Sequence, residues 1–274
     1  MARGIVVLGR WPSIGSIGPW NKLPGKLKRA GEHCLKEIVL VSQRCLENWS
    51  SKKLKILFSI REDWEPNIRR DFRYTHHELI FGGFNGNNLG QYDLLVPLTI
   101  ADLEYLDSIS HLIENNPIPI PSRKSLTLCN DKYLFHQKLV ENGFEKYLPK
   151  ISDHLPYPYI LKKKVDEWGM NSHIIHNREE ELPFSEYLSS SEYFLQELVP
   201  GKEEYTTHIL FSKGRIICAS NIEYVFKTDF FIKGKGENPV TRQIEQSPHL
   251  HLFSSILDVI GFEGLCCFNS LLSG

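Results

Sequence analysis

The stretch from Tyr157 to Ala219 constrains the fold of this chain more than any other. It opens with a short apolar run that ends in a lysine, Pro158-Tyr-Ile-Leu-Lys162. After a gap long enough for a helix comes Phe194-Leu-Gln-Glu-Leu-Val-Pro-Gly-Lys-Glu-Glu-Tyr205, in which Pro200-Gly201 separates two β-rich runs. The pattern predicts a lysine at the end of one strand and two later strands joined by a short linker, with carboxylates just beyond it.

The predicted strand from Tyr157 to Lys164 has two different faces. Alternation places Ile160, Lys162 and Lys164 on one face, and Tyr159, Leu161 and Lys163 on the other. A partly buried ammonium group requires an anion, and a phosphate oxygen would supply a charge-assisted hydrogen bond worth about 1.5 to 3 kcal/mol. The alternative is a solvated lysine run that protects an edge strand from pairing.

A loop and a linker complete the pattern. Residues 166 to 172 contain Gly169 and are typical of a hairpin loop whose backbone amides can fold over phosphates. Beyond the linker, residues 204 to 219 predict a hairpin that turns at Ser212-Lys-Gly214. Backbone groups of Glu197, Leu198 and Val199 are placed to meet the edge of a base, and Glu204 to accept hydrogen bonds from sugar hydroxyls. Taken singly, Glu204 would more often be a surface charge, and Val199 could equally be an ordinary core residue.

A second lysine lies in the first turn of a predicted helix. Asn130 can cap this helix, Gly143 can end it, and its apolar stripe consists of Leu134, Phe135, Leu139 and Val140. The positive charge of Lys132 opposes the helix dipole by about 0.3 to 1 kcal/mol, a cost that disappears if an anionic ligand lies near that end. The alternative is that Asp131 offsets the charge in solvent.

The part of the chain before this helix predicts a small α/β unit. A helix from Ala101 to Ile109 with Thr99 as its cap follows a strand, as in an open sheet. Alternating prolines in Asn116-Pro-Ile-Pro-Ile-Pro121 hold the chain extended and predict a domain boundary. We therefore expect an N-terminal α/β domain over 1–120 and a second domain over 121–274. The β-rich runs of the first are Gly4 to Leu8, Glu37 to Val41, Lys55 to Ser59, Glu78 to Phe81 and Tyr92 to Leu98.

Composition excludes several classes of protein. The 32 basic and 33 acidic residues nearly cancel, which gives no electrostatic case for binding nucleic acid or an anionic membrane. The apolar run near the start is too short for a signal peptide or a membrane span. The 6 cysteines form no CxxC pair, which favours reduced thiols and argues against a sulfur-bound metal. We expect a cytoplasmic protein.

With its motifs taken in order, the chain resembles the ATP-grasp superfamily over about residues 120 to 274. The resemblance implies an α/β fold in which an N-terminal open-sheet domain precedes an ATP-grasp-like domain of two α+β halves, with the nucleotide between them. It implies that Lys132 and Lys162 contact the phosphates of ATP under the Gly169 loop. It also implies that Glu197, Leu198 and Val199 hold the adenine and that Glu204 holds the ribose. The motifs are Asn130-Asp-Lys132, Pro158-Tyr-Ile-Leu-Lys162, the Gly169 loop, Gln196 to Tyr205 and Gly261-Phe-Glu-Gly264.

The resemblance also implies a reaction, in which ATP activates a small-molecule or peptide carboxylate as an acylphosphate that an amine or thiol then attacks. Lysines and Mg²⁺ would spread the developing charge. In place of the family's first acidic metal ligand stands Asn269, a weak ligand for a hard cation, and the chain stops before the second metal motif, so we expect the domain to be incomplete at its C-terminus. The alternatives are an ATP-binding protein without turnover and a sugar-binding module without nucleotide.

Overall fold

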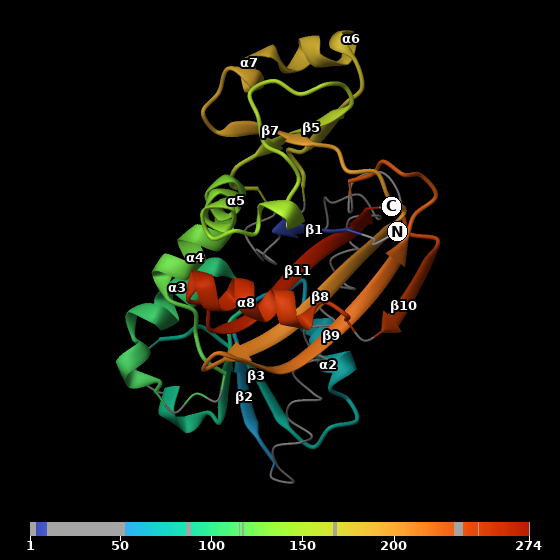
Figure 1. Cartoon of the computed structure of the whole chain (residues 1–274). Helices are drawn as coiled ribbons and strands as arrows, with labels where there is room; N and C mark the ends of the chain where they lie inside the picture. Colours follow the sequence, from blue (N-terminus) through green and yellow to red (C-terminus); the bar gives the residue numbers. More distant parts are fainter. Residues whose placement is uncertain are drawn as a thin grey trace.

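The computed structural model describes residues 4–9, 53–85, 89–114, 116, 118–166, 169–232, 238–245 and 247–273. In this part of the chain the strands form three sheets, with the orders β3-β2-β4, β6-β5-β7 and β1-β11-β8-β9-β10. Figure 1 shows the small β5–β7 layer at one end of the molecule, the large sheet in the middle and the β2–β3 unit at the other end. The expected run from Glu37 to Val41 lies outside the described residues.

The first sheet is parallel and is covered on both faces. Its central strand β2 (Lys55–Phe58) lies between β3 (Glu78–Phe81) and β4 (Leu94–Val96). Helix α2 (Glu65–Asp71) packs through Ile68 on one face, and α3 (Ile100–Ser108) packs through Leu106 on the other. This explains why β2 and β4 are continuous apolar runs rather than alternating ones. The three predicted strands are confirmed, with β4 shorter than expected.

The turn from β4 into α3 is held by hydroxyl groups. Thr99 caps α3, as predicted, because its hydroxyl oxygen accepts from the backbone N–H of Asp102 at 3.0 Å. The hydroxyl groups of Ser59 and Thr99 both donate to Oδ2 of Asp102, at 2.7 and 2.6 Å. These bonds fix the carboxyl end of β2 against the start of α3.

Two helices, α4 (Arg123–Asn130) and α5 (Lys132–Glu141), connect the parallel sheet to the rest of the molecule. The expected cap is corrected: Asp131 caps α5 through the backbone N–H groups of Tyr133 and Leu134, and Asn130 is the last residue of α4. The apolar stripe is corrected as well. Phe135 and Leu139 are buried as predicted, whereas Leu134 and Val140 are 43% and 36% exposed, because the buried surface of α5 is narrower than the predicted stripe.

The small antiparallel sheet has β5 (Tyr159–Lys163) between β6 (His173–Ile175) and β7 (Tyr193–Glu197). The predicted alternation is confirmed: Tyr159 and Leu161 are in the core of this unit together with Phe184 and Leu188, while Ile160 and Lys162 face the other way. The core side is covered by the segment that contains α6 (Arg178–Glu181) and α7 (Ser185–Leu188). Short 3-10 turns occur at Leu89–Gln91, Ser110–Leu112, Glu145–Tyr147 and Leu182–Phe184.

The large antiparallel sheet contains the predicted hairpin of β8 (Glu203–Ser212) and β9 (Arg215–Val225), with β10 (Thr241–Glu245) at its edge. On the other side of β8 lies β11 (Gly264–Ser273). Helix α8 (Leu250–Ile260) lies across one face (Figure 1), where Phe253 stacks on Phe268 at 4.4 Å between ring centroids. The helix ends at Gly261, whose φ is +61°.

Strand β1 (Gly4–Gly9) corrects the expected arrangement of the N-terminal unit. The run from Gly4 to Leu8 is a strand, as predicted, but it pairs antiparallel with β11 in the large sheet rather than with β2. Sequence alone could not show this, because the partner lies at the opposite end of the chain. The domain division at residue 120 stays a prediction.

Two further findings concern expectations from composition. Cys129, Cys266 and Cys267 are free, but Cys218 on β9 is disulfide-bonded, which corrects the expectation that the thiols are reduced throughout. Cysteine spacing does not reveal which side chains approach one another in space. No helix in the described part of the chain is long and apolar enough to cross a membrane.

Candidate functional site

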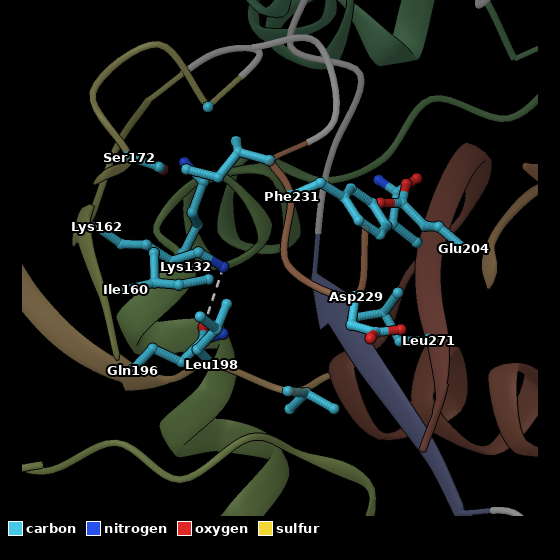
Figure 2. A pocket seen from close by; sticks show the side chains of 14 residues that line it. Lys132, Ile160, Lys162, Ser172, Gln196, Leu198, Glu204, Asp229, Phe231 and Leu271 are labelled. Atoms are coloured by element: carbon cyan, nitrogen blue, oxygen red, sulfur yellow. Dashed lines mark hydrogen bonds between the residues drawn. The ribbon is translucent and has the colours of Figure 1, made fainter. Parts of the chain in front are cut away.

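A pocket lies between the small sheet and the large sheet. Figure 2 shows Lys162, Ile160 and Gln196 on one side of it, and Glu204, Phe231, Asp229 and Leu271 on the other. The residues that line it come from four places: α5, the small sheet with its β5–β6 loop, the linker after β7, and the large sheet with the segment after β9. The full set is Lys132, Ile160, Lys162, Gly169, Ser172, Gln196, Leu198, Val199, Glu204, Asp229, Phe231, Ile232, Asn269 and Leu271.

Both lysines predicted from the sequence line this pocket. Lys162 is on the pocket face of β5, and its Nζ donates to Oε1 of Gln196 at 3.1 Å (Figure 2). Lys132 is the first residue of α5, where its backbone N–H donates to the carbonyl of Lys164 at 2.9 Å and its Nζ donates to the carbonyl of Asp166. The start of α5 is therefore tied to the end of β5, and two ammonium groups lie at one pocket.

The β5–β6 loop closes the same side of the pocket. Asp166 organises it, because its Oδ2 accepts from the backbone N–H of Asn171 at 3.0 Å and its Oδ1 from the Asn171 amide at 2.9 Å. Gly169 has a φ of +67°, a conformation that favours glycine. Ser172 at the end of the loop is buried and lines the pocket.

The opposite wall is acidic and apolar. Glu204 on β8 is only 3% exposed and lies opposite Leu271 of the neighbouring strand β11. Asn269, two residues earlier on β11, accepts from the hydroxyl of Thr206 at 2.8 Å. Because alternate residues share a face, Glu204, Thr206, Asn269 and Leu271 all lie on the face of the large sheet that is opposite α8.

The segment after β9 folds back to form a third side. Phe226 and Phe231 stack with their centroids 3.7 Å apart. The carbonyl of Asp229 accepts from the N–H of Gly201 at 3.0 Å, and that of Lys202 accepts from the N–H of Phe226 at 2.8 Å. These bonds attach the segment to the linker that follows β7.

Glu197 is the one predicted site residue that does not line the pocket. Its Oε2 accepts from the backbone N–H of Lys150 at 3.0 Å, and its own N–H donates to the Lys150 carbonyl at 2.8 Å. The side chain therefore holds the segment before β5 against β7. Leu198 and Val199, which follow it, line the pocket, as do Lys132, Lys162, Gly169, Glu204 and Asn269.

Several lining residues were not among the predicted site residues. Gln196 is on the same face as Ile160 only because these two residues are directly paired between β5 and β7, and a sequence does not reveal that register. Asp229, Phe231 and Ile232 belong to the polar segment from Lys227 to Arg242, whose sequence is equally compatible with a cover over the ligand and with a surface loop. Ser172 is the one residue of this group that the sequence could have indicated, because it ends the loop that was predicted to fold over phosphates.

Burial and a nearby charge both lower the pKa of a histidine close to this site. Burial lowers the pKa of His136 on α5, and the positive charge of Lys162 lowers it further, against the effects of the Pro149 carbonyl and of Glu145. The ring nitrogen Nε2 lies 2.9 Å from that carbonyl, an arrangement in which Nε2 carries the proton and donates.

The residues present do not fit the resident Mg²⁺ that the sequence resemblance implies. Among the described residues, no group of three or more histidine, cysteine, aspartate or glutamate side chains is placed to hold a metal. Asn269, at the expected ligand position, offers a neutral oxygen that already accepts from Thr206, whereas hard cations prefer carboxylates.

The comparisons with solved structures identify the fold. The chain is similar to the D-Ala:D-Ser ligase VanG from Enterococcus faecalis, with 14% identity, a TM-score of 0.54, and coverage of 81% of this chain and 87% of the ligase. It is also similar to a D-alanine–D-alanine ligase from Bacillus anthracis, with 12% identity, a TM-score of 0.52, and coverage of 81% and 83%. The L-amino acid ligase from Bacillus licheniformis matches with 12% identity, a TM-score of 0.51, and coverage of 82% and 64%.

The sequence itself matches no protein-family model and no curated protein. The solved structures named above are members of the ATP-grasp superfamily, and the first two each match 81% of this chain. The chain has the ATP-grasp fold, which belongs to the α/β class expected from the sequence.

Proposed function

We propose that this chain, which has the ATP-grasp fold, binds ATP in the pocket between its two antiparallel sheets. The observation that carries the proposal is the meeting of Lys132 and Lys162, from two different elements, at one pocket whose far wall holds the buried carboxylate of Glu204. Ammonium groups suit the phosphates, and a carboxylate suits sugar hydroxyls because it only accepts hydrogen bonds.

The geometry supports a specific orientation of the nucleotide. Lys132 and Lys162 would contact the phosphates, with the Gly169 loop beside them. Leu198 and Val199 follow β7 and would contact the adenine, and Glu204 would accept from the ribose. One of the D-alanine–D-alanine ligase structures that match is complexed with ATP, at a TM-score of 0.50.

We further propose that the bound ATP activates a carboxylate. A carboxylate oxygen of the substrate attacks the γ-phosphorus, the bond to the bridging oxygen breaks, and ADP leaves. An amine or thiol then attacks the acyl carbon of the acylphosphate and loses its proton, while phosphate leaves and an amide or thioester forms. The role of Lys132 and Lys162 is to stabilise charge on the phosphates.

A direct test separates binding from turnover. ATP is titrated into the protein by calorimetry, and ADP release is then followed with pooled carboxylates and with hydroxylamine as a general nucleophile that traps acylphosphates as hydroxamates. We expect ATP binding and hydroxamate formation that both depend on Lys162. If the wild-type protein does not bind ATP, the nucleotide site is wrong.

A second function is favoured by one observation. Asn269 stands where a carboxylate would be expected for a metal-dependent transfer, and its oxygen already accepts from Thr206. This arrangement suits an ATP-binding protein without turnover. ATP binding with neither ADP release nor hydroxamate would select this function over the ligase.

A further inference from the structure

A row of three polar side chains crosses the large sheet next to the pocket. Strands β11, β8 and β9 lie side by side (Figure 1), and their register places Cys267 directly opposite His208, and His208 directly opposite Ser220. Directly opposed residues of an antiparallel pair have Cβ atoms roughly 4.5 to 5.5 Å apart. A thiol and an imidazole are therefore within reach of each other, with a hydroxyl on the far side of the ring.

This row lies on the pocket side of the sheet. Alternate residues of a strand share a face, so Cys267 is on the side of Asn269, which lines the pocket, and His208 is on the side of Glu204. Two residues span roughly 6.5 to 7 Å along a strand, which is the distance of the row from Asn269. Because β8 leads away from the linker, the row lies on the far side of Asn269 from the residues proposed to hold the adenine and the ribose. In the proposed orientation of ATP, the substrate carboxylate meets the γ-phosphate at this end of the pocket.

The neighbouring cysteine on β11 is an ordinary buried thiol. Cys266 is opposite Ile209 and packs in the core under α8, where burial raises its pKa well above the usual value and keeps it inert. Cys267 is 8% exposed and His208 is 2% exposed, so this pair is buried as well, but an imidazole takes the place of the isoleucine. The Cys267 thiol has a weak contact at 3.9 Å with the carbonyl oxygen of Phe268, and rotation about its Cα–Cβ bond gives it access to His208.

We propose that Cys267 is a catalytic nucleophile that receives the acyl group, with His208 as its base. The inference rests on the proposed activation of a carboxylate by ATP. The sulfur attacks the acyl carbon of the acylphosphate, the bond from that carbon to the phosphate oxygen breaks, and phosphate leaves while His208 keeps the proton of the thiol. The acyl group is then held as a thioester on a buried residue, where little water reaches it.

An amine discharges the thioester. Its nitrogen attacks the thioester carbon, the C–S bond breaks, and the thiolate recovers its proton from His208. The proton that the amine loses passes to the released phosphate, so the two steps balance without an oxidant or a reductant. A thiol acceptor would only exchange one thioester for another of similar energy. The pair of Cys267 and His208 therefore points to an amine as the acceptor.

Acetyl phosphate, a small acylphosphate, tests the first step without ATP. The full chain is incubated with it and digested, and mass spectrometry locates the acetylated cysteines, with release by neutral hydroxylamine as the mark of a thioester. We expect Cys267 to be acetylated about 100-fold faster than Cys266, because a positioned base contributes at least that much. Equal rates at the two cysteines, or no thioester at Cys267, would overturn the inference.

Variants test the role of the base. His208→Ala should slow the acetylation of Cys267 about 100-fold, and added imidazole should restore part of the rate, which a purely structural role of the ring does not explain. Cys266→Ala is the matched control and should leave the rate nearly unchanged. Thermal unfolding without ligand shows whether each variant is folded. If His208→Ala does not fold, the comparison of the two cysteines in the wild type still decides, and an unchanged rate in a folded His208→Ala contradicts the role of base.

Turnover with ATP separates this inference from the proposed function. ADP release is measured with pooled carboxylates and pooled amines, and Cys267→Ala should lose it while Cys266→Ala keeps it. If Cys267→Ala turns over like the wild type, the thioester is not on the path and the inference alone fails. If the wild-type protein does not bind ATP, the proposed function is wrong and the inference falls with it.

Discussion

The hydroxyl of Thr206 donates a hydrogen bond to the side-chain oxygen of Asn269 at 2.8 Å, across the strand pair β8 and β11. Both residues are buried on the pocket side of the large sheet. A hydroxyl can donate equally well to a carboxylate, so the position of residue 269 accepts an aspartate without loss of this bond.

We therefore expect Asn269→Asp to make nucleotide binding depend more strongly on Mg²⁺. The change adds a carboxylate of the same size to the pocket in which we propose that the phosphates bind, and hard cations prefer such ligands. ATP affinity measured by calorimetry with and without Mg²⁺ should differ by several-fold more in the variant than in the wild type. Asn269→Ser, which adds no charge, is the control, and an unchanged Mg²⁺ effect in Asn269→Asp would contradict the expectation.

Neighbouring lysines on β5 provide a matched pair for the phosphate site. Lys162 faces the pocket, whereas Lys163 faces the other way and forms a surface ion pair with Glu192 at 3.1 Å. Lys162→Ala should weaken ATP binding by about 10- to 100-fold, and Lys163→Ala should leave it nearly unchanged. Calorimetry on both variants measures this. Equal losses would mean that the lysines act through general charge and not through the pocket.

The core under α8 should tolerate little change. Phe253 is completely buried and stacks on Phe268 of β11. Phe253→Ala is expected to lower the free energy of unfolding by about 3 to 5 kcal/mol, because it removes buried apolar surface and leaves a cavity. Tyr74→Ala is the comparison, since Tyr74 is 86% exposed and contacts only the Arg73 guanidinium among the interactions described for it. Its cost should stay below about 1 kcal/mol in urea unfolding.

Acid should destabilise the fold below the ordinary histidine pKa. Burial lowers the pKa values of His77, His136 and His249 from 6.5 in the folded protein. The unfolded chain therefore binds protons first as the pH falls, so this contribution to stability is complete above about 6.5 and is lost below it. The urea midpoint should be lower at pH 5.5 than at pH 7.5. His136→Gln should reduce that difference, and an unchanged difference would exclude His136 as a contributor.

Sequence analysis predicted the local structure of the chain well where a side-chain pattern controls it. The alternation around Ile160 and Lys162, the cap at Thr99 and the turn at Ser212-Lys-Gly214 all follow from the chemistry of neighbouring residues. The prediction that Asn130 caps α5 was wrong. Asn130 and Asp131 are both good caps, and only the hydrogen bonds from Tyr133 and Leu134 to Asp131 show which one is used.

Contacts between segments that are distant in the chain could not be predicted from the sequence. The placement of Gln196 beside Lys162 depends on strand register, and the turn of Glu197 toward Lys150 depends on a segment that no periodicity connects to β7. The position of Asp229 and Phe231 at the pocket likewise depends on distant contacts. The Asp229 carbonyl accepts a hydrogen bond from Gly201 of the linker, and the Phe231 ring stacks on Phe226. Such relationships are set by tertiary packing, which a single sequence does not encode in a readable pattern.

The pairing of β1 with β11 has a consequence for how the molecule is made on the ribosome. Gly4 meets Ser273 and Gly9 meets Phe268, so during synthesis β1 leaves the exit tunnel long before β11, the strand with which it pairs. Closing so long a loop is entropically slow. The large sheet can thus be completed only after translation has passed β11, and until then the edge of β1 is open to pairing with other chains.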